Sequence, residues 1–186
     1  GSSGQKTIAG DLLINGDLSI NTGIVCAVNS DTITVNNNSY IQGTLMISTG
    51  SFDADGNFDA GSGNINFTDN GKLFLSSTVT SLGTLFSDNG TVIYDGTDQV
   101  IYADQYNDLT IGGSTGTKSL SNSTSVNSAF SVNPGVTFSD GLNRPFSVYG
   151  TADIDGTLSV SVNGDLDFNG PFNATGGMIT FAGNGN

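Results

Sequence analysis

Apolar and polar residues alternate along most of this chain in short runs. Side chains of a β-strand point alternately to its two faces, so a period of two predicts a strand that is buried on one side. No long window repeats apolar residues at the helical spacing of i, i+3, i+4 and i+7. In the clearest run, these apolar residues fall on one side: Phe52, Ala54, Phe58 and Ala60. The pattern predicts half-buried strands with a polar outer face.

Turns rich in glycine, asparagine and aspartate separate these runs. They lie roughly 20 to 25 residues apart, which is the length of one coil of a parallel β-solenoid. Examples are ISTG at 47–50, TDNG at 68–71 and SDNG at 87–90. We therefore predict an all-β parallel β-solenoid (β-helix) of roughly eight short-strand coils of about 22 residues. An antiparallel β-sandwich is the alternative, because short strands at a spacing of about 8 to 12 residues also suit that class.

The ends of the chain set the expected domain boundaries. Residues 1–6 have the composition of a linker or a cloning remnant, and the alternating pattern begins after them. We expect residues 7–186 to be a single solenoid segment cut from a longer repeat protein.

Charge narrows the range of partners. The chain has 17 acidic and four basic residues and a formal net charge of −13. Nucleic-acid binding needs clustered cations to neutralise phosphates, so we expect no nucleic-acid partner. No stretch approaches the ~20 apolar residues of a bilayer-spanning helix, so we expect no direct membrane insertion. The single cysteine, Cys26, lies in an apolar run and is expected to be a buried thiol.

Catalytic chemistry is not indicated. The chain has no histidine for general acid–base work, and its four basic residues lie far apart in sequence. No nucleophile motif, phosphate-binding loop or zinc-ligand spacing is present. We expect no enzyme activity and no cofactor, apart from a calcium candidate.

That calcium candidate is a run of oxygen-bearing side chains at every second position: Asp53, Asp55, Asn57 and Asp59. Carboxylate and amide oxygens at this spacing can gather around Ca²⁺. The run lacks the bidentate glutamate of an EF-hand loop, and the chain contains no glutamate at all. The alternative is that these residues form the solvated outer face of one strand.

Aromatic residues give a second candidate site. Tyr94, Tyr102 and Tyr106 lie within one coil's length, close to several aspartates. Exposed tyrosine rings stack on sugars while carboxylates bond to hydroxyls, so these tyrosines are candidate glycan-binding residues. The alternative is a packed ladder or corner filler.

Residues 90–120 carry a motif of the form G-T-V-x-Y-x-G-x-x-Q-x-I, then Y-N-D-L-T-I, then G-T-K-x-L. This motif resembles the repeats of large secreted, adhesin-like surface proteins of Bacteroidota. Further along, Ser128 stands where those repeats have glycine. The resemblance implies a right-handed solenoid, an extracellular or cell-surface location on a bacterium, and a structural or adhesive role as a rigid spacer with a binding face.

Partners implied by this role are glycans or host and cell-surface proteins. The alternative functions are a carbohydrate-binding module and a self-assembling scaffold element. End-to-end self-association is expected if solenoid ends are left open, because an uncapped end is a template for another copy.

Overall fold

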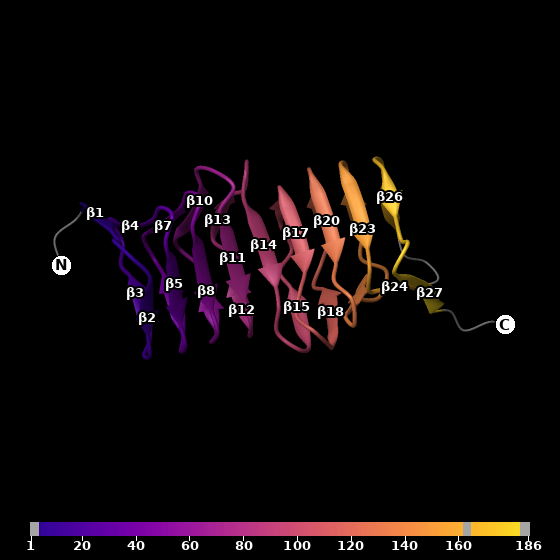
Figure 1. The fold of residues 1–186 in the computed structure, drawn as a ribbon, viewed down its shortest axis with the longest axis horizontal. Helices are drawn as coiled ribbons and strands as arrows, with labels where there is room; N and C mark the ends of the chain where they lie inside the picture. The colour runs from indigo at the N-terminus through magenta and orange to yellow at the C-terminus, as the bar shows by residue number, and fades with distance from the viewer. Residues whose placement is uncertain (1–3, 162–164, 183–186) are drawn as a thin grey trace. The chain divides into compact units, whose positions relative to one another are not determined.

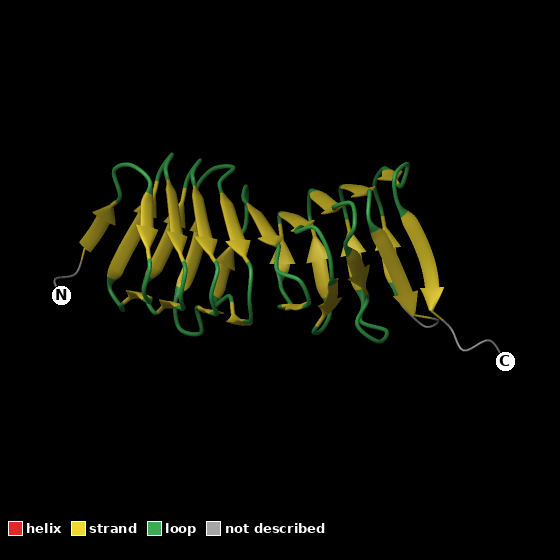
Figure 2. Cartoon of the chain, turned by 60° about the horizontal axis from the view of Figure 1, so that its bottom comes forward, coloured by secondary structure: helices red, strands yellow, loops and turns green. Residues whose placement is uncertain are grey.

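The computed structural model describes residues 4–161 and 165–182. Within these ranges every regular element is a β-strand, and Figure 2 shows strands joined only by loops. Parallel sheets stack as a β-solenoid of about nine turns, which confirms the predicted fold class. All described pairings are parallel, so the antiparallel sandwich is wrong. Register partners lie from 19 residues apart, as Val25 and Thr44 do, to 22 apart, as Ala129 and Thr151 do. The turns are therefore slightly shorter and more numerous than expected.

The chain divides into two compact units, residues 1–92 and 93–186. In the first unit the sheets contain β1-β4-β7-β10-β13, β2-β5-β8-β11 and β3-β6-β9-β12. The strands are β1 (Gly4–Thr7), β2 (Leu12–Ile14), β3 (Leu18–Ile20), β4 (Ile24–Val28), β5 (Thr32–Val35), β6 (Ser39–Ile41), β7 (Thr44–Ile47), β8 (Ser51–Ala54), β9 (Phe58–Asp59), β10 (Asn64–Phe67), β11 (Lys72–Leu75), β12 (Val79–Ser81) and β13 (Thr84–Phe86). In Figure 1, successive strands of one sheet such as β5, β8 and β11 lie side by side.

Strand β14 (Thr91–Tyr94) spans the division between the units. In the second unit the sheets contain β17-β20-β23-β26, β15-β18-β21-β24-β27 and β16-β19-β22-β25. The strands are β15 (Gln99–Ile101), β16 (Gln105–Tyr106), β17 (Asp108–Ile111), β18 (Thr117–Leu120), β19 (Thr124–Val126), β20 (Ala129–Val132), β21 (Thr137–Ser139), β22 (Phe146–Val148), β23 (Thr151–Ile154), β24 (Thr157–Ser161), β25 (Leu166–Phe168), β26 (Phe172–Asn173) and β27 (Met178–Ala182).

The first strand starts earlier than the sequence suggests. Residues 1–6 were expected to be a linker, yet β1 begins at Gly4 and pairs in parallel with β4, from Gly4 opposite Ile24 to Thr7 opposite Ala27. Residues 1–3 lie outside the described ranges. The polar composition of β1 hid it, because its residues are exposed and show no apolar alternation.

Each core is a set of columns in which a side chain packs on its counterpart one turn away. In the first unit, Ile33, Phe52 and Leu73 are in register, and so are Val35, Ala54 and Leu75; all six are buried. In the second unit, Phe130, Phe138 and Phe146 come from β20, β21 and β22 of one turn, and their rings meet across the core at centroid distances of 4.8 to 5.0 Å. A fully buried phenylalanine contributes about 2–3 kcal/mol of hydrophobic stabilisation. The period-two pattern therefore defined the inner face correctly.

Several glycines allow the backbones of adjacent turns to approach closely. A Cβ atom on Gly150 would lie 1.8 Å from the carbonyl oxygen of Ser128. One on Gly116, where φ is +92°, would lie 1.9 Å from the carbonyl oxygen of Thr97. A side chain at either place requires backbone movement, which explains why turns are glycine-rich.

Candidate functional site

The acidic run that suggested calcium lies on two strands. Asp53 is on β8, with Thr34 and Phe74 in register on the neighbouring strands, whereas Asp59 is on β9 in a different sheet. The chain turns between them at Gly56, where a Cβ atom would lie 2.3 Å from the carbonyl oxygen of Asn37. The expectation of a single strand is thus corrected: the alternation continues through a corner.

This corner changes what the four side chains can do together. Asp59 accepts a hydrogen bond from the Gly61 N–H at 2.9 Å, while Asp55 and Asn57 are both exposed at the turn. Within the described ranges, no three acidic, histidine or cysteine side chains gather closely enough to hold a metal ion. Calcium binding by Asp53, Asp55, Asn57 and Asp59 has no geometric support here and stays a prediction.

The three candidate tyrosines form a network at the corner between β15 and β16. The hydroxyl of Tyr106 donates to the carbonyl oxygen of Tyr102 at 2.6 Å, and the hydroxyls of Tyr94 and Tyr106 lie 3.0 Å apart. The backbone N–H of Tyr102 donates to the Tyr94 hydroxyl at 3.1 Å. A hydroxyl carries one proton. Since that of Tyr106 is used on Tyr102, Tyr94 must donate to Tyr106. Two core tyrosines thus satisfy both backbone groups of Tyr102.

This arrangement removes Tyr94 and Tyr106 from the glycan-stacking hypothesis, which stays a prediction for Tyr102. Tyr94 and Tyr106 both have 0% exposure, so neither ring can face a sugar, and only Tyr102 is partly exposed. Burial raises the pKa of both Tyr94 and Tyr106 well above the ordinary tyrosine value. Val92, Ile93 and Tyr94 are all buried, so burial in β14 does not alternate, and Tyr94 lies in the core together with Val92. The packed-corner alternative describes the rings of Tyr94 and Tyr106.

A buried lysine, Lys118, lies on the inner side of the β15-β18-β21-β24-β27 sheet. Lys118 of β18 is in register with Gln99 and Phe138, and its Nζ donates to the carbonyl oxygen of Thr115 at 3.1 Å. Burial lowers the pKa of Lys118, and the carboxylates of Asp95 and Asp98 act in the opposite direction. Its amine thus bonds to the backbone of the turn that leads into β18.

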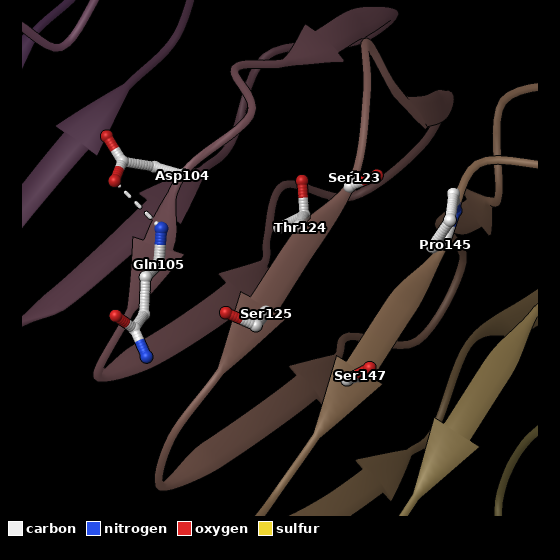
Figure 3. A pocket seen from close by; sticks show the side chains of 7 residues that line it. All are labelled: Asp104, Gln105, Ser123, Thr124, Ser125, Pro145 and Ser147. Atoms are coloured by element: carbon white, nitrogen blue, oxygen red, sulfur yellow. Dashed lines mark hydrogen bonds between the residues drawn. The ribbon is translucent and has the colours of Figure 1, made fainter.

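A polar groove lies on the outer side of the β16-β19-β22-β25 sheet, which we call the groove sheet. Its cavity is about 390 Å³, within the usual size range of small-ligand sites. Figure 3 shows the lining side chains on three successive turns. They are Asp104, Gln105, Ser123, Thr124, Ser125, Pro145 and Ser147. Three of them, Gln105, Ser125 and Ser147, are in register from strand to strand.

Several polar atoms in this groove have no protein partner. In the described part of the chain, the side-chain hydroxyls of Ser123, Ser125 and Ser147 make no hydrogen bond. One carboxylate oxygen of Asp104 accepts the Gln105 N–H at 2.8 Å, drawn as the dashed line in Figure 3. Partial burial raises the pKa of Asp104, opposed by this backbone bond. The groove therefore presents one carboxylate and three hydroxyls ready to bond to a ligand.

The wall of the groove at Pro145 is fixed by a strained loop. Gly141, Leu142 and Asn143 all have φ between 61° and 69°, a region that leucine rarely adopts. The buried Asp140 anchors the loop by accepting hydrogen bonds from the backbone N–H and the hydroxyl of Ser161. The carbonyl oxygen of Pro145 accepts the Thr124 N–H at 3.0 Å. Backbone strain of this kind concentrates at binding sites.

Sequence inspection missed this groove for a physical reason. Ser123 and Ser125 stand in a Ser/Asn-rich stretch that looks like an ordinary turn. Gln105 precedes Ser125 by 20 residues, and Ser147 follows Ser125 by 22. Only the register of the parallel strands places them together. Because these two spacings differ, alignment of the chain on one fixed turn length does not superpose Gln105, Ser125 and Ser147.

An apolar pocket of about 330 Å³ lies at the last described turns of the second unit, lined by Leu158, Val160, Leu166, Phe168, Phe172, Ile179 and Phe181. Its outermost members, Phe172, Ile179 and Phe181, are exposed. The expected end-to-end self-association stays a prediction, which light scattering against protein concentration would test.

Searches with this chain against protein-family models, curated proteins and solved structures gave no match. Among the described residues, no helix has the length and apolarity needed to span a bilayer. Functional inference therefore depends on the geometry of the chain itself.

Proposed function

We propose that this chain is a structural repeat segment of a secreted or cell-surface bacterial protein, in which it acts as a stiff spacer. The observation that carries the proposal is the in-register ladder inside each unit. Each strand bonds to its counterpart one turn away, and apolar residues stack in the same register. Structure of this kind resists bending and shear, because every turn is fixed by both of its neighbours.

Two further observations support the proposal. The conspicuous glycines, buried tyrosines and buried lysine are engaged in turns and corners. The motif in residues 90–120 resembles repeats of secreted surface proteins of Bacteroidota, which supports the proposed location.

Single-molecule force spectroscopy tests the spacer role. The chain is placed between two reference domains of known unfolding force and pulled from both ends. We expect resistance well above the entropic elasticity of an unfolded chain, with length increments of roughly 60–75 Å for each turn of 19–22 residues released. Extension along the curve of an unfolded chain, without resolved steps, would refute the proposal.

The location is tested separately in the organism that produces the chain. Antibodies against the chain should label intact cells or the culture medium, and external protease should remove the signal from cells. A signal confined to the cytoplasmic fraction would contradict the proposed location.

A further inference from the structure

We propose that the groove on the outer face of the groove sheet binds a neutral, hydroxyl-rich ligand of the saccharide class. The site comprises Asp104, Ser123, Ser125 and Ser147, with Pro145 as its apolar wall. This inference is independent of the spacer role, because a spacer needs no ligand.

The hydrogen-bonding groups define what the ligand must offer. An ionised carboxylate only accepts hydrogen bonds, so Asp104 requires a donor from the ligand. The serine hydroxyls both donate and accept. A saccharide carries neighbouring hydroxyls that do both, and its C–H faces can lie against the exposed ring of Pro145. The free acceptor of Asp104 and the three unengaged hydroxyls thus match adjacent sugar hydroxyls.

Other ligand classes fit less well. No cationic side chain lines the groove, which disfavours anions such as phosphates and uronates. A calcium ion takes six to eight oxygens, usually with several carboxylates, and the groove has only Asp104. An extended peptide recognises free backbone groups at a sheet edge. The backbones of β16, β19 and β22 are already paired with neighbouring strands. A saccharide, by contrast, can be bound through hydrogen bonds to side chains, without free backbone groups.

The groove is organised for an elongated ligand. Gln105, Ser125 and Ser147 repeat on successive strands, and Asp167 of β25 continues the same register. Adjacent strands are about 4.8 Å apart, so polar groups recur at that interval across the sheet. The Asp140 loop holds Pro145 in place before any ligand arrives. A site that is ordered in advance loses less entropy on binding.

Affinity electrophoresis provides the test. The chain is run in gels containing starch, hydroxyethylcellulose, mannan or laminarin, with alginate as an anionic comparison. At least one neutral polymer should retard the chain more than alginate does. Calorimetry with oligosaccharides of the retarding polymer then gives the affinity, which we expect to fall at least tenfold in Ser147→Tyr and in Asp104→Ala.

A matched control separates blocking of the groove from general damage. Ser119 is an outward-facing serine on β18, in a different sheet, and Ser119→Tyr should bind like the original chain. Thermal unfolding verifies that all variants fold. Three results would overturn the proposal. The first is that no neutral polymer retards the chain, and the second is that Ser119→Tyr and Ser147→Tyr lose saccharide affinity equally. The third is that Ser147→Tyr and Asp104→Ala both bind saccharide as well as the original chain does. A calcium-induced rise in Tm that Asp104→Ala abolishes, without saccharide binding, would assign a cation site instead. Ser147→Tyr should unfold at the same force as the original chain. A failure of the saccharide-binding proposal therefore leaves the spacer proposal intact.

Discussion

The hydroxyl of Tyr106 is the best single place to test how the corner of the second unit is stabilised. Tyr106→Phe keeps the ring and removes only the oxygen that donates to the Tyr102 carbonyl and accepts from Tyr94. Because the ring is fully buried, packing should be preserved. We expect the change to destabilise the fold through lost hydrogen bonds alone.

The size of the effect follows from the groups left without partners. A buried polar group without a hydrogen bond costs about 1–3 kcal/mol. Tyr106→Phe orphans the Tyr94 proton and the Tyr102 carbonyl, but Tyr102 is partly exposed and water can restore part of its bonding. We expect a loss of about 2 kcal/mol. Tyr94→Phe orphans the Tyr102 N–H and should cost about 1 kcal/mol. The double variant should cost less than the sum of the two, because both single changes break the same shared bond.

Urea unfolding followed by circular dichroism measures these differences, and amide exchange at Tyr102 reports on the corner itself. Tyr149 is exposed and its hydroxyl has no described partner, so Tyr149→Phe is the matched control. It should change stability by less than about 0.5 kcal/mol. Unchanged stability and unchanged Tyr102 exchange in Tyr106→Phe would refute the network as a source of stability.

The same tyrosines predict sensitivity to alkali. Burial raises the pKa of Tyr94 and Tyr106, so the folded chain keeps protons that the unfolded chain releases above about pH 10. The contribution of these two protonated hydroxyls to the free energy of unfolding is present in full below that pH. It falls as the pH rises toward the folded-state pKa, by up to about 1.4 kcal/mol per pH unit for each group. Tyr94→Phe/Tyr106→Phe should show a shallower decline above pH 10. If stability fell equally steeply above pH 10 in the double variant and in the original chain, burial of the two tyrosines would not be the cause of the decline.

Three other predictions follow from local geometry. Gly116→Ala should destabilise the fold by at least about 2 kcal/mol, because positive φ and a backbone clash act together. Gly10→Ala should cost about 1 kcal/mol, because φ is +88° but the surrounding space is open. Gly16→Ala should cost least, because the space is open and φ is not positive. Equal urea midpoints for Gly116→Ala and Gly16→Ala would contradict this order. Ser39 is buried with no partner for its hydroxyl, so Ser39→Ala should stabilise by about 1 kcal/mol, and a lower Tm would show that the hydroxyl is satisfied. Burial raises the pKa of Cys26, so its thiol should react with a disulfide reagent at pH 8 far more slowly in the native chain than in guanidinium, and comparable rates would show that it is accessible.

Much of the fold could be predicted from side-chain alternation. Phe52, Ala54, Phe58 and Ala60 all point inward, as the period of two indicates. The corner at Gly56 was not apparent, because the alternation continues through it and the close approach to Asn37 comes from another turn. The same limit explains the error over the tyrosines: proximity in sequence suggested a shared surface, whereas Tyr94 and Tyr106 meet inside the core.

The groove could not be predicted for a related reason. Gln105, Ser125 and Ser147 belong to three different turns, and none stands in a recognisable motif. Their proximity depends on register, which is set by turn lengths that vary between 19 and 22 residues. A shift of one residue in any turn would place a serine on the opposite face of its strand.

The short, repeated spacing between paired strands has a consequence for the order in which the chain folds. Within each unit, in-register partners are separated by only 19–22 residues in a chain of 186, about one-tenth of its length. Such a low contact order is typical of fast-folding helical bundles and unusual for β-proteins. No described strand waits for a distant part of the sequence before it can pair. At synthesis rates of about 5–20 residues per second, a ribosome completes the next turn every ~1–4 s, and each finished turn offers the next one a template.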